Sequence, residues 1–386
     1  MQGRSSTATA ASAPEGGKPA VTVVDCDVHP HFVDGMKDLE PYLSTAWRKR
    51  LGMGHAEAWA REVYASEVSI PKNVLYTNPV GVMRRDTVPE DGSVPCGDPA
   101  FVVRDHLEAN GIDRAVLVGG SVLGLGGLPD ADLATALASA HNEWMSETWL
   151  AADPRYRGSL VVAPQDPQQG AAEIDRVGER PGFVQIHLPL VNVLMGDRWY
   201  FPIYEAAERH GLPVAIHPNS IDGIFAKAPW LAGGVYTYYT EWHAALSQVF
   251  HGNTISLVCQ GVFERFPGLK VVICEGGFAW LPDVMWRLDK DWRSLRDELP
   301  WLKRPPSEYI VEHLRVTTQP FVEVERRSHL TALLEIIRAD QTLLYSSDYP
   351  HWDFDHPTRA LSGVPQETRS RILADNAREL YAERLL

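Results

Sequence analysis

Histidine and carboxylate side chains recur at the ends of short apolar segments in this sequence. These side chains are Asp27, His29, His31, His187, His217, Glu275 and Asp348. Buried strands do not finish repeatedly in ionisable groups unless something satisfies their polar atoms. A divalent metal ion would do so, and mixed imidazole and carboxylate ligands suit zinc, with manganese or iron as alternatives. The pattern therefore predicts one metal ion at the mouth of a parallel sheet.

The first of these segments has polar residues at alternate positions. Asp25, Asp27 and His29 share one face of an extended strand, and the residues between them point to the other face. Asp27 and His29 can therefore both reach a common ion. Pro30 ends regular pairing and leaves the direction of His31 open.

Each of these signals also has a purely structural interpretation. His187 alone would be a polar residue lining a barrel, whereas His217 before Pro218 and Asp348 after an apolar strand are more specific. Hydrogen-bonded side chains that plug the top of a barrel are the alternative to a metal. That alternative would have to arise independently on four or five strands, so we favour the metal.

Eight apolar runs alternate with helical patterns and supply these strand ends. Strands are expected at Val21–Asp27, Arg114–Gly119, Ser159–Ala163, Phe183–Leu188, Pro213–His217, Lys270–Glu275, Arg315–Thr318 and Thr342–Asp348. Continuous Val, Ile and Leu runs are typical of buried parallel strands. Eight of them predict an α/β fold, a (β/α)8 TIM barrel. A doubly wound open sheet is the alternative, but no Gly-rich nucleotide loop follows the first strand.

Two long insertions follow strands 1 and 5. Residues 33–98 are too many for an ordinary loop and predict a cap, and Pro218–Thr240 predicts a lid-like segment. Both leave the carboxyl ends of strands, where barrel active sites lie. Residues 1–20, rich in Ala, Ser, Thr and Gly, predict a disordered leader, and residues 21–386 a single barrel domain.

The composition excludes several classes of function. The formal net charge of -14 leaves no overall basic footprint for nucleic acid. Four cysteines without a C-x-x-C pair predict reduced thiols and a cytoplasmic protein. The sequence has no stretch of about 18 apolar residues, so no membrane span is expected. The expected partner is a small-molecule substrate.

Several longer stretches resemble one known family. They are Val24–His29, Tyr200–Ala207, Leu212–Pro218, Gly261–Pro267, Lys270–Gly277, Trp280–Pro282 and Ser347–His351. These stretches resemble the amidohydrolase-related family, also called amidohydrolase 2. Its members include aminocarboxymuconate-semialdehyde decarboxylase and the resorcylate and carboxyvanillate decarboxylases. The resemblance runs from about Val21 to the C-terminus, and it is specific for the family but not for a substrate.

The resemblance implies a barrel with one metal ion and a homodimer. It places Asp27 and His29 as ligands on strand 1, His217 on strand 5 and Asp348 on strand 8. Some members carry H-x-H on strand 1, so His31 could take the place of Asp27. Relatives studied as decarboxylases usually have His at the end of strand 6, where this chain has Glu275.

The glutamate favours hydrolysis as the expected reaction. A metal held by Asp27 and Asp348 lowers the pKa of a bound water from about 15.7 towards about 7. Asp348 would accept a proton from that water, and Glu275, a possible further ligand, would donate one to a leaving group or orient a ligand. We therefore expect a hydrolase acting on a small amide, ester, lactone or activated carbonyl.

Two other functions remain open. The first is non-oxidative decarboxylation of an aromatic or enoic carboxylate, which calls for a cationic clamp. Arg84 and Arg85 in the cap could supply the clamp, and His187 and His351 are further candidates for substrate contact. The second is a catalytically inactive binding barrel, which is disfavoured because every ligand position is occupied.

Overall fold

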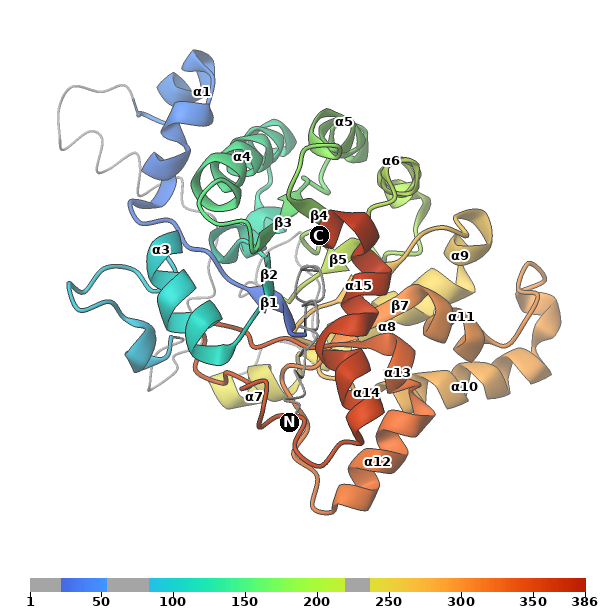
Figure 1. Cartoon of the computed structure of the whole chain (residues 1–386). Coiled ribbons are helices and arrows are strands. Elements are labelled where there is room, and N and C mark those ends of the chain that lie inside the picture. Colours follow the sequence, from blue (N-terminus) through green and yellow to red (C-terminus); the bar gives the residue numbers. More distant parts are fainter. Residues whose placement is uncertain (1–21, 54–82, 219–236) are drawn as a thin grey trace, which may run out of the picture.

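The computed structural model describes residues 22–53, 83–218 and 237–386. Eight strands form one parallel sheet in chain order (Figure 1). They are β1 (Val24–Val28), β2 (Arg114–Leu117), β3 (Tyr156–Val161), β4 (Phe183–His187), β5 (Val214–Ile216), β6 (Val271–Ile273), β7 (Leu314–Thr317) and β8 (Leu343–Leu344). All eight predicted strands are confirmed. The last is much shorter than predicted, because the chain leaves regular pairing before it reaches Asp348.

Hydrogen bonds between β1 and the segment after β8 join the two edges of the sheet. The Cys26 amide donates to the Tyr345 carbonyl over 2.9 Å, and the His29 amide donates to the Tyr349 carbonyl over 2.9 Å. A doubly wound sheet has two open edges and a strand order that reverses. The sequential order and the joined edges therefore exclude that alternative and confirm the (β/α)8 barrel.

Helices surround the strands (Figure 1). The α-helices are α1 (Thr45–Arg50), α3 (Pro99–Val102), α4 (Ala131–Trp144), α5 (Pro167–Val177), α6 (Phe201–His210), α7 (Tyr239–Ala244), α8 (Ser247–Cys259), α9 (Val262–Arg265), α10 (Leu281–Ser294), α11 (Pro306–His313), α12 (Arg327–Ile336), α13 (Ala339–Thr342), α14 (Gln366–Ser370) and α15 (Asn376–Tyr381). The 3-10 and π-helical segments are η1 (Gly35–Tyr42), η2 (Arg85–Thr87), η3 (Val103–Glu108), η4 (Gly120–Gly127), η5 (Met145–Leu150), η6 (Arg198–Tyr200), η7 (Arg296–Glu298), η8 (Arg371–Asp375) and η9 (Ala382–Leu385).

Local sequence explains where the helices next to the barrel begin. Asp166 caps α5 by accepting hydrogen bonds from the amides of Gln168 and Gln169, with Pro167 in the first turn. Asp130 caps α4 in the same way through the Leu133 amide. These caps satisfy amides that have no partner within the helix and so set the start of each crossover.

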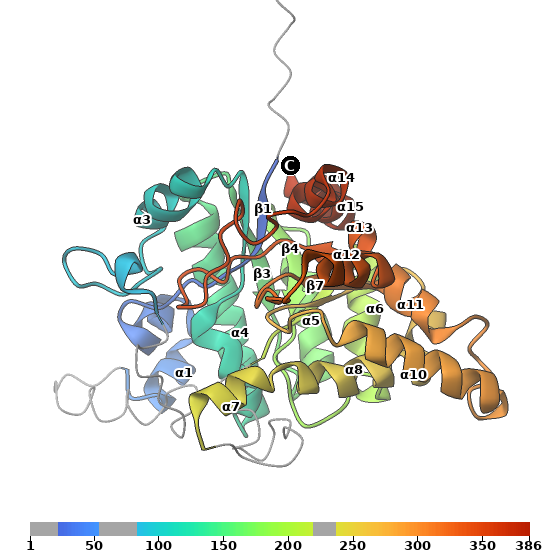
Figure 2. The same cartoon turned by 90° about the horizontal axis from the view of Figure 1, so that it is seen from below.

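A distinct apolar cluster fills the barrel. Its buried members from the strands and strand ends are Val24, Cys26, Val116, Val184, Ala215, Val272, Cys274 and Leu344, and they pack with Tyr381 and Leu385 near the C-terminus. Side chains of non-adjacent strands can meet in this way only inside the barrel. Figure 2 shows α14 and α15 at one end of the barrel, with α1 and α7 at the other. The carboxyl ends of β1 and β5 therefore face the end of the barrel at which α1 and α7 lie.

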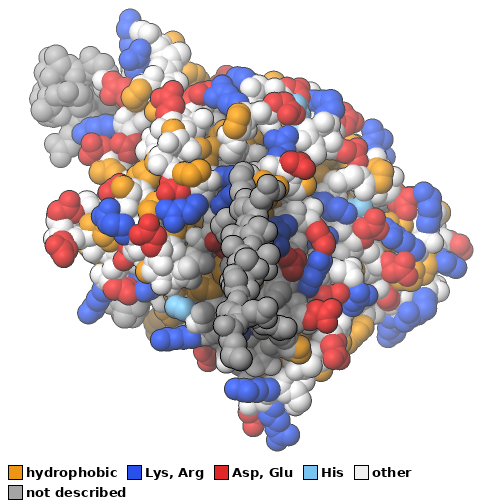
Figure 3. Space-filling model, viewed as in Figure 1, with side chains coloured by type: hydrophobic (Ala, Val, Ile, Leu, Met, Phe, Trp, Pro, Cys, Tyr) orange, Lys and Arg blue, Asp and Glu red, His pale blue; other side chains and the backbone are white. Residues whose placement is uncertain are grey.

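Three predicted segments lie wholly or partly outside the described residues. They are the leader, the middle of the cap at 54–82, and most of the lid at 219–236. Among the described residues, no helix combines the length and apolar character needed to cross a bilayer. On the face shown in Figure 3, acidic and basic side chains are interspersed.

Candidate metal centre

The side chains of β1 diverge at an irregularity in the strand. The register with β2 shifts between Asp25 and Val28. Asp27 faces His217, whereas the Asp25 carboxylate accepts a hydrogen bond from His106 on the outer helix η3. The prediction that Asp25, Asp27 and His29 share one face is therefore wrong at Asp25, because the irregularity breaks the alternation of an extended strand.

Two overlapping groups of possible ligands lie at the strand ends. Asp27, His29 and His217 form one group, and His29, Glu275, Asp348 and His351 form the other. Within each group, one possible ligand atom from every residue lies within 4.8 Å of the others. We call these six residues the metal cluster. They come from the ends of β1, β5, β6 and β8, so the barrel gathers residues that are far apart in the chain.

His29 and His217, the two histidines among the predicted ligands that lie in the metal cluster, each have a fixed ring orientation. His29 donates through Nδ1 to the Val118 carbonyl over 3.0 Å, and His217 donates through Nδ1 to the Pro218 carbonyl over 2.5 Å. Each Nε2, when it carries no proton, therefore directs a lone pair into the metal cluster. Metal-binding histidines are held by a second hydrogen bond of this kind.

Buried polar atoms at the centre of the metal cluster make no hydrogen bonds. They are both carboxylate oxygens of Asp27, Nε2 of His29, Nε2 of His217 and Oδ2 of Asp348. His29 Nε2 lies 2.9 Å from Asp348 Oδ1 and 3.3 Å from Asp27 Oδ1, yet it makes no hydrogen bond to either. Hydrogen-bonded plugs would not leave these atoms unsatisfied. The atoms fit a divalent metal ion, which would satisfy nitrogen and oxygen donors together.

The metal cluster favours positive charge. Burial lowers the pKa of His217, but Asp27 and the Glu275 carboxylate, whose Oε2 lies 3.0 Å from Nε2, outweigh it and hold the pKa well above its ordinary value. Burial likewise acts against a raised pKa at His351, yet the Asp348 carboxylate raises it to about 9. The field that attracts a proton to these imidazoles would equally attract a cation.

Glu275 and Asp348 both have an uncommon backbone conformation. Their φ angles are 51° and 62°, in the left-handed region that disfavours residues with a side chain. The Glu275 amide donates to Thr317 Oγ1 over 3.0 Å, which ties this turn to β7. Such strained conformations persist where the surrounding structure enforces them, and they cluster at functional sites.

The remaining predicted histidines have different positions. His31 lies outside both ligand groups, and its ring centroid is 6.4 Å from that of His351. His187 at the end of β4 is buried, and neither ring nitrogen makes a hydrogen bond. Burial, with a contribution from His217, lowers its pKa well below the ordinary value. His187 thus presents an unsatisfied neutral ring near the cluster.

The structure does not bring the predicted arginine clamp to the metal cluster. Arg84 donates through Nε to Asp86 over 3.0 Å, and its guanidinium stacks 4.3 Å above the Phe354 ring. Arg85 is exposed. The Arg84 amide donates to the Pro350 carbonyl over 2.9 Å, so the described backbone of this segment lies beside the site. The guanidinium of Arg84 is therefore engaged by Asp86 and Phe354.

Sequence reasoning missed an aromatic and charged group at the start of α7. His243 Nε2 lies 3.0 Å from Asp353 Oδ2, and its ring stacks on Tyr239 with centroids 5.5 Å apart. The Tyr239 hydroxyl accepts a hydrogen bond from Trp352, the residue after His351. The only available signal was the pair of aromatic-rich segments around Tyr239 and Trp352. Nothing in the sequence shows that they meet.

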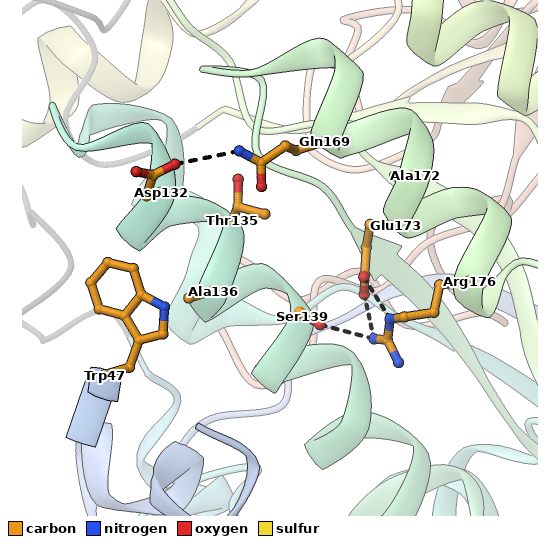
Figure 4. Close-up of a pocket in the computed structure, with 9 residues that line it drawn as sticks. All are labelled: Trp47, Asp132, Thr135, Ala136, Ser139, Gln169, Ala172, Glu173 and Arg176. Atoms are coloured by element: carbon orange, nitrogen blue, oxygen red, sulfur yellow. Dashed lines mark hydrogen bonds and ion pairs between the residues drawn. The ribbon is translucent and has the colours of Figure 1, made fainter. Parts of the chain in front are cut away.

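A surface pocket between α4 and α5 is separate from the metal cluster. It has a volume of about 500 Å³ and is bordered by Trp47 of α1 (Figure 4). Its lining residues include no member of the metal cluster. The carboxylate of Glu173 is already bonded to Arg176 and Asn142. We therefore assign no function to this pocket.

Comparison with known proteins gives the family and corrects one expectation. The chain is 26% identical over 270 residues to a γ-resorcylate decarboxylase of Polaromonas sp., covering 66% of this chain and 78% of that protein. A 5-carboxyvanillate decarboxylase from Sphingomonas paucimobilis has a similar structure, with 21% identity, a TM-score of 0.62, and 94% of this chain and 99% of that chain covered. The 5-carboxyvanillate decarboxylase of Novosphingobium aromaticivorans, complexed with manganese, is also similar in structure. Its sequence identity is 19% and its TM-score 0.64, with 95% of this chain and 97% of that chain covered.

These relatives are named decarboxylases and not hydrolases, which overturns the expectation of hydrolysis based on Glu275. A carboxylate at the end of β6 is compatible with more than one reaction, because it can orient a ligand as well as donate a proton. The amidohydrolase family model matches residues 25–382, which include all of the barrel strands except the first residue of β1 and every residue of the metal cluster. The chain is therefore a member of the amidohydrolase family of enzymes.

Proposed function

We propose that this enzyme is a metal-dependent, non-oxidative decarboxylase of an aromatic carboxylate. The observation that carries the proposal is the unsatisfied, buried donor set of Asp27, His29, His217 and Asp348 in a chain whose relatives are named decarboxylases. Decarboxylation of this kind replaces a carboxylate on an aryl carbon by a proton and releases carbon dioxide. It needs a charge anchor for the substrate and a group that delivers the proton.

Asp27, His29, His217 and Asp348 would hold the metal. When bound, a divalent ion supplies Lewis acidity that orients an anionic substrate and stabilises developing negative charge. His29 and His217 keep Nε2 directed into the site through their Nδ1 hydrogen bonds. Three carboxylates surround the position, those of Asp27, Glu275 and Asp348. The oxygen-rich set suits manganese, so Mn²⁺ is the first ion to test, before the zinc that the sequence suggested.

Asp348 and His351 are the proposed proton-delivering pair. His351 Nδ1 lies 2.7 Å from Asp348 Oδ1, and the His351 ring stacks on His29 with centroids 4.7 Å apart. A proton held between Nδ1 and Oδ1 would pass to the aryl carbon as the carbon–carboxylate bond breaks and its electron pair remains on the ring. Glu275, whose Oε2 lies 3.0 Å from His217 Nε2, would be a further oxygen ligand of the metal.

His243 of α7 is the proposed cationic contact for the substrate. Burial lowers its pKa, but the Asp353 carboxylate outweighs this effect and raises it. Gln319 fixes Asp353 by donating to Oδ2 over 2.7 Å. The flanking rings of Tyr239 and Trp352 offer apolar surface for an aromatic substrate. We therefore assign the cationic contact with the substrate to His243, in place of the Arg84 and Arg85 that the sequence suggested.

The experiment compares two reaction classes on purified enzyme loaded with Mn²⁺. Hydroxybenzoates and other aryl carboxylates would be screened for release of carbon dioxide, beside a panel of amides, esters and lactones screened for hydrolysis. We expect turnover of aryl carboxylates only. Hydrolysis with no release from any carboxylate would refute the proposal. The homodimer implied by the family resemblance stays a prediction, to be checked by light scattering.

A further inference from the structure

A second buried polar network includes both chain neighbours of Asp348. It consists of Asp25 on β1, His106 on η3, and Ser347 and Tyr349 after β8, and we call it the Asp25 network. The four side chains are at most 1% exposed. None of them belongs to the metal cluster. The network is therefore inaccessible to substrate but adjacent in sequence to a candidate ligand.

Asp25 is the centre of the network. Ser347 donates twice to its carboxylate, from the amide to Oδ1 over 2.9 Å and from Oγ to Oδ2 over 2.5 Å. His106 donates from Nε2 to Oδ2 over 2.8 Å, and the Asp27 amide lies 3.3 Å from Oδ1. Four donors hold this carboxylate in one orientation, and charge-assisted hydrogen bonds are among the strongest available.

Tyr349 extends the network to the other side of Asp348. Its amide donates to Ser347 Oγ over 3.1 Å, and its ring stacks on His106 with centroids 4.3 Å apart. Its hydroxyl donates to Asp105 of η3 over 2.7 Å. The residues before and after Asp348 are thus both anchored, one to a strand and one to a helix.

The anchoring explains how Asp348 keeps its conformation. Its φ of 62° lies in the left-handed region, which a residue with a side chain leaves unless its neighbours prevent it. In this conformation Oδ1 is 2.9 Å from His29 Nε2, and Oδ2 is buried without a hydrogen bond. A relaxed backbone would turn the carboxylate away from His29 and remove one ligand from the cluster.

The presence of serine, histidine and aspartate does not make the network a nucleophilic triad. In a triad, the histidine lies between the serine and the aspartate and accepts the serine proton. Here the aspartate is in the middle, because Ser347 Oγ donates to Asp25 and lies 3.5 Å from His106 Nε2. His106 has already directed that nitrogen to Asp25. The serine therefore has no base to activate it.

We propose that the Asp25 network is the positioning apparatus of the metal centre, and that it sets metal affinity by holding Asp348 in ligand geometry. The proposal rests on the metal-dependent function proposed above. Its members are positioning residues, since none of them touches the substrate. A network that served only stability would change unfolding without changing metal binding.

The test compares two alanine substitutions on the same segment. Ser347→Ala removes the hydroxyl that links Asp25 to the Tyr349 amide. Ser346→Ala is the matched control, because Ser346 is equally buried but its hydroxyl accepts from the Gln319 amide, over 3.1 Å. Free Mn²⁺ would be measured by electron paramagnetic resonance while chelator-treated full-length protein is titrated, and Tm would be recorded in parallel. We expect Ser347→Ala to weaken Mn²⁺ binding at least about tenfold, and Ser346→Ala to leave it within about twofold of wild type.

Equal Mn²⁺ affinities of the two variants would overturn the proposal, whatever their Tm values. If Ser347→Ala does not fold, Tyr349→Phe provides the second measurement, because it removes only the hydrogen bond to Asp105. A smaller loss of Mn²⁺ affinity is expected there, and unchanged affinity would again refute the role. Failure of the decarboxylase proposal would appear separately, as wild-type protein that binds Mn²⁺ tightly but releases no carbon dioxide.

Discussion

Asp348 combines three properties that are seldom found at one residue. It is 1% exposed, its Oδ2 is buried without a hydrogen bond, and its backbone is left-handed. A carboxylate in such a position is costly unless a cation or a proton compensates it. The same residue is hydrogen-bonded to His351, so in the proposed mechanism it connects metal binding to proton transfer. Both roles should fail when the carboxylate is replaced.

We predict that Asp348→Asn lowers turnover at least about a hundredfold, because a proton carrier and a ligand oxygen are lost together. Loss of stability should be modest, since the amide preserves shape. Carbon dioxide release and Tm are the measurements, with the exposed Asp340→Asn as the control. Near-normal turnover would remove Asp348 from the mechanism.

His141 on α4 is a second unusual residue, and it affects stability. It is fully buried beside Phe32 and Trp144, and neither ring nitrogen makes a hydrogen bond. Burial lowers its pKa to about 3. In the unfolded chain, His141 therefore binds a proton near pH 6.5. In the folded chain it binds the proton only near pH 3. Its contribution to stability is complete above pH 6.5 and is lost as the pH falls towards 3.

We predict that the wild-type protein loses about 2 kcal/mol of unfolding free energy from this residue between pH 6.5 and pH 5. In His141→Gln, the free energy of unfolding should fall less between pH 7 and pH 5 than in wild type, by about that amount, because glutamine does not titrate. Urea unfolding at both pH values measures this, and the exposed His329→Gln should behave like wild type. An undiminished pH dependence in His141→Gln would contradict the assignment.

At the scale of elements, the ends of β1, β5, β6 and β8 together with one helix form the site. β1 supplies Asp27, and the residue directly after this strand is His29. The segment after β8 supplies Asp348 and His351. α7 adds His243, which pairs with Asp353 of that same segment. The described end of the cap approaches through backbone contacts, including the pairing of Met83 with His351. Substrate charge should therefore be recognised from α7 and not from the cap.

We predict that His243→Gln raises KM for an aryl carboxylate about tenfold or more, which corresponds to the loss of a hydrogen bond to a charged group. Arg84→Ala should change KM by less than about threefold, because its guanidinium is held by Asp86 and Phe354 and such surface interactions contribute little. Steady-state kinetics on Mn²⁺-loaded enzyme distinguish the two. The reverse order of effects would restore the arginine clamp.

At the scale of the whole molecule, the metal cluster joins parts of the barrel that meet only on closure. Its residues come from the first, fifth, sixth and last strand ends. Because mutually repelling carboxylates converge there, a bound cation should stabilise the closed barrel against unfolding.

We predict about one divalent ion per chain by elemental analysis, and a fall in Tm of several degrees when a chelator removes it. Metal at about one hundred times its Kd stabilises a native state by about 2.7 kcal/mol. Adding Mn²⁺ back should restore Tm in wild-type protein but much less in His217→Gln. A Tm that does not change after verified metal loss would contradict this coupling.

The sequence predicted most of the fold because buried parallel strands have a strong signal. The runs ending near Asp27, His187 and Glu275 are mostly apolar, and all eight strands are found. Prediction failed where pairing becomes irregular. Asp25 departs from the face of Asp27 because the register shifts, and no property of the residues themselves reports that shift.

By itself, the sequence determined the barrel, its strand ends and the residue types that could bind a metal, because these depend on local pattern and composition. Only the tertiary structure decided which of these residues meet. It placed His217 beside Asp27, left His31 outside the ligand groups and engaged Arg84 with Asp86. It also brought His243 to Asp353 and Ser347 to Asp25. The physical reason is barrel closure, since contacts between the first and last strands depend on register and not on neighbouring residues.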